Sequence, residues 1–567
     1  MAAGIKKIRI GELLLKAKKI TEEELQKALK IQENENNHRK LGDILIKEGF
    51  VSEEDVINLI ADQYKIELIN NIQADFKFIQ QFNIPIQILE KYGAIPIKTS
   101  EKIAKEVTVA FIDPTDIEAL NTIQRYIRKP IKLAIALSKD IKTELTQLKN
   151  REKADSIIKR MKDELTGKEL AKDDDESATM QFIKHIIDLA IQRRASDIHI
   201  ETDLNKKTEE IIVKIRARVD GSLQPIMTAE HELFGAISAR IKLLSDLNIS
   251  EKRKPQDGRF SMRLNDNSFD FRVSTLPTAT GESIVIRILD KRNVTKKLED
   301  IGIDSKNLNK LTKALHAPNG IVLVTGPTGS GKSTTLYAAL NRIKAEAEKI
   351  ITVEDPVEYQ MDLINQVNVN EPIGLTFAAA LRSILRQDPD IIMVGEIRDQ
   401  ETLEIAIKAA LTGHLVISTL HTNDAVSAIS RMIDMGADPF MVGAAVVAIE
   451  AQRLVKKICP YCKTKEKPRS ALLEPIKHIL PPNAVFYKGE GCSECNMTGY
   501  SGRTLITEVF TLDEEISSLV AKNENIIEIE KLARKKGYEP MFMNGLIKAL
   551  KGETTLEEVY RVAKVKL

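Results

Sequence analysis

The stretch GIVLVTGPTGSGKSTTLYAAL, residues 320–340, decides how the C-terminal half of this 567-residue chain folds. An apolar run ends directly before a glycine-rich loop, and a helical pattern begins where that loop ends. The loop has the spacing G-x4-G-K-S, in which glycines let backbone amides curl around phosphate oxygens with no Cβ in the way. The N-terminus of the following helix adds a positive dipole. The stretch therefore predicts a strand, a phosphate loop and a helix that together bind ATP.

The same loop predicts which residues hold the nucleotide and its metal ion. We expect Lys332 to reach the β- and γ-phosphates and Ser333 to ligate Mg²⁺. The expected nucleotide-binding residues are Gly326, Pro327, Thr328, Gly329, Ser330, Gly331, Lys332, Ser333 and Thr334.

Three further apolar segments, KIITVED, DIIMVGE and HLVISTL, follow the loop and alternate with helical stretches. This alternation predicts a parallel sheet covered on both faces, and therefore an α/β domain. Ligands of such sheets bind at the carboxyl ends of the strands, and hydrolysis of ATP needs acidic groups there to hold Mg²⁺ or to orient water. We therefore expect the site to include Glu358, Glu396, His414 and His421.

The remainder of the chain divides by composition. Residues 1–148 are helix-rich and then mixed, and residues 149–177 have the charged, polar composition of a flexible or loosely helical linker. Residues 178–305 contain the strand candidates SDIHIE, EEIIVKIRARVDG, FDFRVSTLP and ESIVIRIL, which predict a smaller α+β domain. Residues 306–567 hold the phosphate loop and end in an amphipathic helical tail.

The four segments around the loop resemble the Walker A, Asp box, Walker B and His box of the secretion-type ATPases that power type II secretion and type IV pili. The resemblance runs over residues 177–567. It implies a RecA-like ATPase domain preceded by a PAS-like domain, and a homohexameric ring in which ATP lies between these two domains. It also makes Glu358 and Glu396 the candidates for activating water and organising Mg²⁺, and leaves open which of them is the general base.

The segments RASDIHIE, RARVDG, KRKPQDGRF and FRVSTLPTATGESIVIRIL are similar to the smaller motor domain of that family. By this resemblance Arg272 and Arg287 would reach the γ-phosphate as arginine fingers. The alternative is that both are surface arginines in ordinary ion pairs, which contribute little. Arg382, Arg386 and Arg398 flank the Walker B segment and could serve either the site or a subunit interface.

The four cysteines form two close pairs, Cys459-Pro-Tyr-Cys462 and Cys492-Ser-Glu-Cys495, and none lies elsewhere. Two C-x2-C pairs can supply four thiolates to a tetrahedral Zn²⁺, which would make the site structural rather than catalytic. The alternative is four unrelated thiols. Assembly and secretion ATPases of the family often carry such a subdomain, here at about residues 455–503, whereas pilus retraction ATPases generally lack it.

The chain opens with a module that occurs twice, RIGELLLKAKKITEEELQKALKIQ at residues 9–32 and KLGDILIKEGFVSEEDVINLIADQ at residues 40–63. The spacing of the leucines allows a purely structural docking module. The repeat also resembles the cyclic di-GMP-binding regulatory domain found on some of these ATPases, and a ligand with two equal halves suits two modules. The residues that this resemblance assigns to the ligand are Arg9, Gly11, Leu14 and Gln32 in the first module and Lys40, Gly42, Leu45 and Gln63 in the second.

Composition excludes some classes of protein. The 84 basic and 82 acidic residues nearly cancel, and no basic stripe marks a path for DNA, so no nucleic-acid substrate is expected. No apolar run reaches the roughly 18–20 residues of a membrane span, and no apolar signal segment follows the N-terminus. We expect a cytoplasmic protein that is peripheral at the inner membrane through its partners.

Together these patterns predict an ATP hydrolase, a hexameric motor that drives type IV pilus assembly. Its expected partners are an inner-membrane platform protein and cytoplasmic proteins of the pilus machine. A type II secretion motor is the alternative within the family. A DNA-translocating ATPase would use the same loop, and a non-hydrolysing nucleotide-binding scaffold is disfavoured because every acidic strand end is intact.

Overall fold

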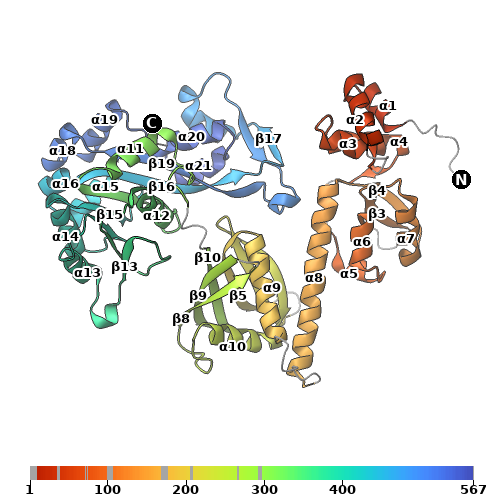
Figure 1. Cartoon of the computed structure of the whole chain (residues 1–567), viewed down its shortest axis with the longest axis horizontal. Helices are drawn as coiled ribbons and strands as arrows, with labels where there is room; N and C mark the ends of the chain where they lie inside the picture. Colours follow the sequence, from red (N-terminus) through yellow and green to blue (C-terminus); the bar gives the residue numbers. More distant parts are fainter. Residues whose placement is uncertain are drawn as a thin grey trace. The chain divides into compact units, whose positions relative to one another are not determined.

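The computed structural model describes residues 9–34, 39–69, 72, 74–98, 106–167, 177–204, 209–264, 267–290 and 296–565. The chain divides into two compact units (Figure 1): residues 1–178 with 491–497, and residues 179–490 with 498–567. Within the described part of the chain, every helix is too short or too polar to cross a membrane.

The first unit begins with two helical modules of the same construction. Thr21 and Glu24 form a capping box, in which the Glu24 amide donates to Thr21 Oγ1 (3.3 Å) and the Thr21 amide donates to the Glu24 carboxylate (2.7 Å). Ser52 caps the second module by accepting from the Asp55 amide (3.1 Å). The second helix of each module thus begins with a side-chain cap at the same place in the repeat. The helices are α1 (Ile10–Lys16), α2 (Glu22–Asn34), α3 (Leu41–Lys47) and α4 (Glu53–Tyr64).

A four-stranded sheet follows in the same unit, in the order β1-β4-β3-β2, with only β2 antiparallel to its neighbour. The strands are β1 (Glu67–Leu68), β2 (Ala94–Ile97), β3 (Val107–Phe111) and β4 (Ile131–Ile135). The helices are α5 (Phe76–Gln80), α6 (Ile86–Tyr92), α7 (Ile117–Ile127) and α8 (Ser138–Leu165). Residues 149–165, expected to begin a flexible or loosely helical linker, instead continue α8, because Ala154, Ile157 and Met161 give the helix a buried face. Residues 168–176 of that segment lie outside the described residues.

The second unit begins with an antiparallel sheet in the order β7-β6-β5-β10-β9-β8 (Figure 1). All four strand candidates of this region are strands, and β7 and β8 are additional. The strands are β5 (Ala195–Leu204), β6 (Ile211–Val219), β7 (Ser222–Glu230), β8 (Gln256–Leu264), β9 (Asn267–Thr278) and β10 (Gly281–Asp290). The helices are α9 (Ala178–Gln192), the 3-10 helix η1 (His231–Leu233) and α10 (Phe234–Leu244).

A seven-stranded sheet in the order β13-β12-β14-β15-β11-β16-β19 forms the centre of the same unit, with only β19 antiparallel. Alternate residues of β11 enter different hydrophobic clusters: Ile321 and Leu323 pack with α13 and α14, whereas Val322 and Val324 pack with α11 and α12. The predicted parallel sheet with two covered faces is therefore confirmed. Its strands are β11 (Gly320–Thr325), β12 (Ile350–Glu354), β13 (Ile364–Asn368), β14 (Ile391–Val394), β15 (Leu415–Leu420), β16 (Val446–Ile458) and β19 (Tyr500–Thr511).

Helices and a small hairpin complete this unit, and the predicted helical tail is present as α18 to α21. The α-helices are α11 (Ser305–Leu315), α12 (Lys332–Ile343), α13 (Phe377–Ile384), α14 (Gln400–Leu411), α15 (Ser427–Asp434), α16 (Pro439–Ala445), α17 (Ser470–Leu473), α18 (Glu514–Ala521), α19 (Ile526–Lys535), α20 (Met541–Leu550) and α21 (Leu556–Val562). The hairpin pairs β17 (Lys463–Glu466) with β18 (Phe486–Gly489).

Candidate functional site

The phosphate loop begins where β11 ends at Thr325 and finishes where α12 begins at Lys332. Gly326 and Gly331 have φ angles of 150° and 95°, which residues with a Cβ rarely adopt. A Cβ on Gly326 would lie 2.5 Å from Ser330 Oγ and 2.8 Å from the backbone oxygen of Gln452. The glycine spacing is thus required by backbone curvature and by close packing behind the loop.

The loop opens into a cavity of about 790 Å³, a volume typical of small-molecule sites. The loop contributes six of its nine predicted residues to the wall, and Gly326, Pro327 and Ser330 are not among them. Other wall residues come from the ends of the parallel strands and from the antiparallel sheet. Together with the six loop residues, the wall includes Ser196, Asp197, Arg218, Arg287, Tyr337, Glu354, Asp355, Glu358, Glu396, Thr419, His421 and Arg503.

Backbone carbonyl groups of the phosphate loop hold the side chain of Lys332 over the loop. Its Nζ donates to the carbonyl oxygens of Gly326 (2.8 Å) and Pro327 (3.2 Å). Burial lowers the pKa of Lys332, whereas the nearby Glu396 carboxylate opposes that shift. The loop therefore presents a partly desolvated cation to the cavity, as phosphate binding requires.

Glu396 lies just beyond β14 and has two side-chain partners, Arg398 and His421. Arg398 pairs with Glu396 and with Asp355 (3.2 Å), and the bond to Glu396 raises the pKa of Arg398. His421, just beyond β15, places Nε2 3.3 Å from Glu396 Oε2. The structure thus brings the predicted Glu396 and His421 together, and Arg398 contacts the site through Glu396 without lining the cavity itself.

The other two arginines of that predicted group have different partners. Arg382 pairs with Glu401 on α14, and Arg386 donates to the backbone oxygen of Arg382 (2.8 Å). Neither is among the residues that line the cavity.

Glu358 and Arg272 form a two-point ion pair. Arg272 Nη2 lies 2.7 Å from Glu358 Oε2, Nη1 donates to Oε1 (3.1 Å), and Nη2 also donates to the Val357 carbonyl (3.3 Å). Arg272 lies on β9 and Glu358 follows β12, so the pair connects the antiparallel sheet to the ATPase sheet. Glu358 lines the cavity, and Arg272 reaches it through Glu358.

Arg287 belongs to a second group that sequence reasoning found only in part. Its Nε donates to Asp197 Oδ1 (3.0 Å), and Arg218 Nε lies 3.8 Å from the other oxygen of that carboxylate. Asp197 is 7% exposed and is held by Ser196 Oγ (2.7 Å). The segments RASDIHIE and RARVDG carried these residues, but their strand pairing, which brings Asp197 opposite Arg218, could not be read from either one alone.

Glu354 ends β12 but is a structural carboxylate. It is 5% exposed and accepts from Thr352 Oγ1 (2.6 Å), Gln366 Nε2 (3.1 Å) and the Tyr337 hydroxyl. Burial and the Glu354 charge raise the pKa of Tyr337 far above its ordinary value, so the hydroxyl stays a donor. Tyr337 was not predicted, because on the helix after the loop it has the pattern of an ordinary core residue.

His414 is the predicted site residue that the fold separates from the rest. It precedes β15, whereas His421 follows that strand, and six residues of strand span about 20 Å. Its Nδ1 donates to the Ala409 carbonyl (2.9 Å), and it is not among the described residues that line the cavity. Within this chain His414 thus lies apart from the phosphate loop, because both ends of the strand carry a histidine and only the carboxyl end meets the loop.

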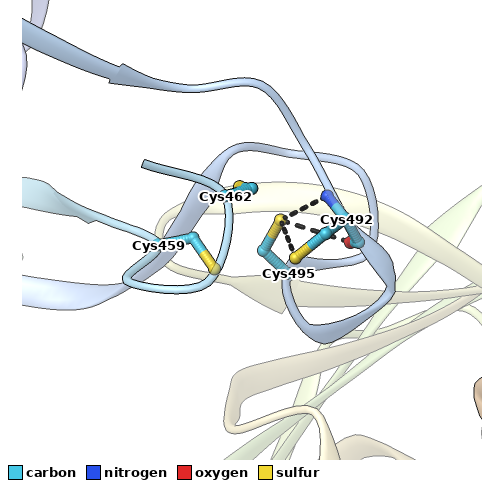
Figure 2. Close-up of side chains that lie close together, drawn as sticks. All are labelled: Cys459, Cys462, Cys492 and Cys495. Atoms are coloured by element: carbon cyan, nitrogen blue, oxygen red, sulfur yellow. Dashed lines mark hydrogen bonds between the residues drawn. The ribbon is translucent and has the colours of Figure 1, made fainter. Parts of the chain in front are cut away.

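The four cysteines come together as one cluster. Their sulfur atoms all lie within 4.8 Å of one another, and Figure 2 shows the two pairs facing each other. Cys492 Sγ lies 3.7 Å from Cys495 Sγ, close to the roughly 3.8 Å between two thiolates on a tetrahedral Zn²⁺. The chain on either side of the pair Cys492 and Cys495 is held beside the first pair by two backbone hydrogen bonds. The Cys459 amide donates to the Gly499 carbonyl, and the Glu490 amide donates to the Cys462 carbonyl (both 3.0 Å). The donor set and spacing fit zinc.

The predicted ligand residues of the tandem modules form two groups, the leucines and glycines on the one hand and the polar residues on the other. Leu14 and Leu45, both assigned to the ligand by the resemblance, are completely buried in one hydrophobic cluster, so the structure gives them a packing role. A Cβ on Gly11 would lie 2.7 Å from Leu25 Cδ1, which makes that glycine a packing residue; the nearest atom to a Cβ on Gly42 would be 3.7 Å away.

The polar residues of the modules lie at helix ends. Arg9 and Lys40 occupy the same position, immediately before α1 and α3, with nearly equal φ and ψ angles. Lys40 pairs with Asp113, and this bond raises the pKa of Lys40. Gln32 Nε2 donates to the Arg39 carbonyl (2.8 Å), and Gln63 lies in the last turn of α4.

Comparisons with known proteins agree with this geometry. The sequence model of the type II/IV secretion system protein family matches residues 172–561, and that of the MshEN domain matches residues 63–155. The type IV pilus assembly ATPase PilB of Myxococcus xanthus is 39% identical over 97% of this chain and 98% of its own. A type II secretion system protein E of Xanthomonas campestris is 37% identical over 98% of both chains. The Legionella pneumophila ATPase DotB, 22% identical with a TM-score of 0.50 over 67% of this chain and 95% of its own, shares the fold.

Proposed function

The chain belongs to the type II/IV secretion system protein family and is an ATP-hydrolysing enzyme, and we propose that it is the motor of type IV pilus assembly. The observation that carries this proposal is the similarity over nearly the whole length to a pilus assembly ATPase. The cavity beside the phosphate loop, lined by charged and polar residues, agrees with it. The motor would be a cytoplasmic homohexamer that acts on an inner-membrane platform protein and other pilus-machine proteins, with no nucleic-acid substrate.

Turnover of ATP by the purified full chain, with its platform protein present, tests the motor. We expect Lys332→Ala and Glu396→Ala to lose turnover, because one removes the phosphate-binding cation and the other the acidic group beside it. A wild-type chain without turnover under these conditions contradicts the proposal.

Type II secretion is the second candidate, because a full-length secretion relative is almost as similar as the pilus relative. Deleting the gene separates the two. Loss of surface pili with normal enzyme export supports pilus assembly, and the reverse supports secretion.

Within the site we assign a role to each residue set. Lys332 would bind the β- and γ-phosphates and Ser333 would ligate Mg²⁺, which when bound neutralises phosphate charge. Glu358, held by Arg272, and Glu396, held by Arg398 and His421, are the two candidates for orienting water.

Single-turnover measurements distinguish the two carboxylates. We expect the Gln variant of the water-orienting residue to bind MgATP normally but hydrolyse it slowly. The Gln variant of the metal-organising residue should instead require a higher Mg²⁺ concentration. We also propose that Arg287, which shares Asp197 with Arg218, would bind transition-state charge once the carboxylate releases it.

We propose that the cysteine cluster binds one structural Zn²⁺, since four thiolates within 4.8 Å close a tetrahedral site. Metal analysis of the purified chain should give one zinc per chain, and Cys492→Ser should lower that content. A full-length chain that folds without zinc contradicts this assignment.

For the N-terminal modules we propose cyclic di-GMP as ligand, bound by the polar helix-end residues Arg9, Gln32, Lys40 and Gln63 and not by the leucines. Duplication with matching geometry at Arg9 and Lys40 supports this. The MshEN match at residues 63–155 includes only Gln63 of these four residues. Calorimetric titration should give heat with cyclic di-GMP and none with Arg9→Ala. Absence of heat from the wild type, against a known binder, contradicts it.

A further inference from the structure

Gln452 lies on β16 directly behind the phosphate loop, and its side chain is completely buried. β16 pairs in parallel with β11, and the last paired residues are Thr325 and Ala451. Beyond Thr325 the chain leaves the sheet and turns into the loop at Gly326. Gln452 still pairs with Thr507 of β19 on one side, and on its other side it is the first residue of β16 that faces the loop instead of β11.

Both ends of the Gln452 amide are used. Its Nε2 donates to the Ser330 carbonyl (2.8 Å), and its Oε1 accepts from Thr335 Oγ1 (2.7 Å). Ser330 lies inside the loop, and Thr335, also completely buried, lies in the first turn of α12. One amide thus joins the loop to the helix that follows it.

The backbone of the loop also fits closely against this residue. A Cβ on Gly326 would lie 2.8 Å from the Gln452 carbonyl oxygen, and one on Gly331 would lie 3.1 Å from its Nε2. Gln452 is therefore one reason why two positions of the motif leave little room for a Cβ. The contact covers both ends of the loop.

The neighbouring Arg453 extends the contact to a second site segment. Its Nη1 donates to the Gln452 carbonyl (3.0 Å), and its Nη2 donates to the Asn423 carbonyl (2.9 Å). Asn423 lies two residues after His421, so the carbonyl of Gln452 is connected to the segment that carries that histidine.

We propose that Gln452 is a positioning residue for nucleotide binding, which holds the phosphate loop in its binding curvature through Ser330 and Thr335. The proposal rests on the proposed nucleotide site and adds a residue that does not touch the nucleotide. Removing the amide leaves the Ser330 carbonyl and the Thr335 hydroxyl buried without partners, and the loop must change shape to satisfy them. Binding of phosphate groups then weakens.

Gln452→Met tests this, because it removes the amide and nearly keeps the side-chain volume. MgADP binding to the full chain should weaken about tenfold, the effect of losing two buried hydrogen bonds, with a smaller fall in kcat than in kcat/KM. The matched control is Gln256→Met. Gln256 likewise uses both ends of its amide, which bonds two backbone groups of Asn248 and one of Glu251, but it lies on β8 away from the cavity. This control should lower the Tm without changing MgADP affinity.

Thr335 supplies a second arm if Gln452→Met fails to fold. Thr335→Val should weaken MgADP binding, and Thr335→Ser, which keeps the hydroxyl, should weaken it less. The proposal is overturned if Gln452→Met or, should that variant not fold, Thr335→Val binds MgADP as tightly as the wild type. It is also overturned if Gln256→Met weakens binding equally. A wild-type chain that fails to bind MgADP would instead overturn the nucleotide site itself.

Discussion

The phosphate loop and the tandem N-terminal modules are both recognisable sequence patterns, yet the fold exposes most residues of the first to a cavity and buries the leucines of the second. Six of the nine loop residues line the cavity, whereas Leu14 and Leu45 of the modules are completely buried. The loop follows a strand buried on both faces, so a sheet built from other segments supplies its core. The two modules, each of two short helices, must instead build one shared core from their own apolar residues. Apolar residues of a motif thus predict packing more safely than binding.

The largest expected effect tests the loop side of this comparison. Lys332→Ala should lower ATP turnover about 10²–10³-fold, because a phosphate-binding cation acts inside a partly desolvated cavity. Lys47→Ala, the same change at an exposed position on α3, should leave basal turnover within about twofold. A steady-state ATPase assay measures both. Similar losses in both variants would mean that the effect is not specific to the loop.

The next effect tests the module side. Leu45→Ala should destabilise the helical modules by about 2–5 kcal/mol, the usual cost of truncating a buried leucine. Hydrogen exchange of α1 to α4 measures this locally, with Glu48→Ala on the exposed surface as control. If Leu45→Ala left exchange unchanged and removed cyclic di-GMP binding, the leucine would be a ligand residue after all.

Glu450 is the converse of the buried leucines, because it is an acidic residue that lies in the core of the nucleotide domain. It is completely buried, neither carboxyl oxygen has a hydrogen-bond partner in the structure, and burial with the nearby Glu508 raises its pKa well above the ordinary value. The folded state therefore keeps a proton that the unfolded state releases above its own pKa, so this group lowers stability as pH rises through that window.

Glu450→Gln should remove this penalty. Unfolding monitored by circular dichroism should show a Tm about 2–5 °C higher at pH 8, with a smaller gain at pH 5. An equal gain at both pH values would show that the effect is not one of ionisation.

A smaller effect compares the two ends of β15. His421→Ala should lower turnover about tenfold, because Glu396 loses a hydrogen-bond partner beside the cavity. His414→Ala should change turnover less than about twofold. Kinetics of the two variants at equal MgATP concentrations measures the difference. A larger loss for His414→Ala would show that His414, at the other end of the strand, contributes more to ATP hydrolysis than His421 does.

The smallest effect concerns the Lys40–Asp113 ion pair, whose side chains are 68% and 31% exposed. Lys40→Met should change stability by less than about 1 kcal/mol, as exposed pairs usually do, while weakening cyclic di-GMP binding. Thermal unfolding and calorimetry measure the two quantities. A large stability loss with unchanged binding would make Lys40 a structural residue like Leu45.

Much of the ATPase sheet could be predicted from sequence, since β11, β12, β14 and β15 are short apolar runs between helices. β16 was missed because VVAIEAQRLVKKI combines apolar residues with four charged residues, so it shows neither a continuous apolar run nor a regular alternation. The signal that could have exposed Gln452 is a polar pair, Gln452 and Arg453, within a run that is otherwise mostly apolar. Asp197 and Arg218 were missed because each is one polar residue on an alternating strand.

By itself the sequence determined the phosphate loop with its strand and helix, the paired cysteines and the duplicated modules. Each of these depends on neighbours within a few residues, where spacing alone specifies backbone shape. Only the tertiary structure decided that His421 meets Glu396, that Glu358 pairs with Arg272 and that His414 lies apart. These contacts depend on which strands become neighbours and in which register, and that is set by packing between segments far apart in the chain.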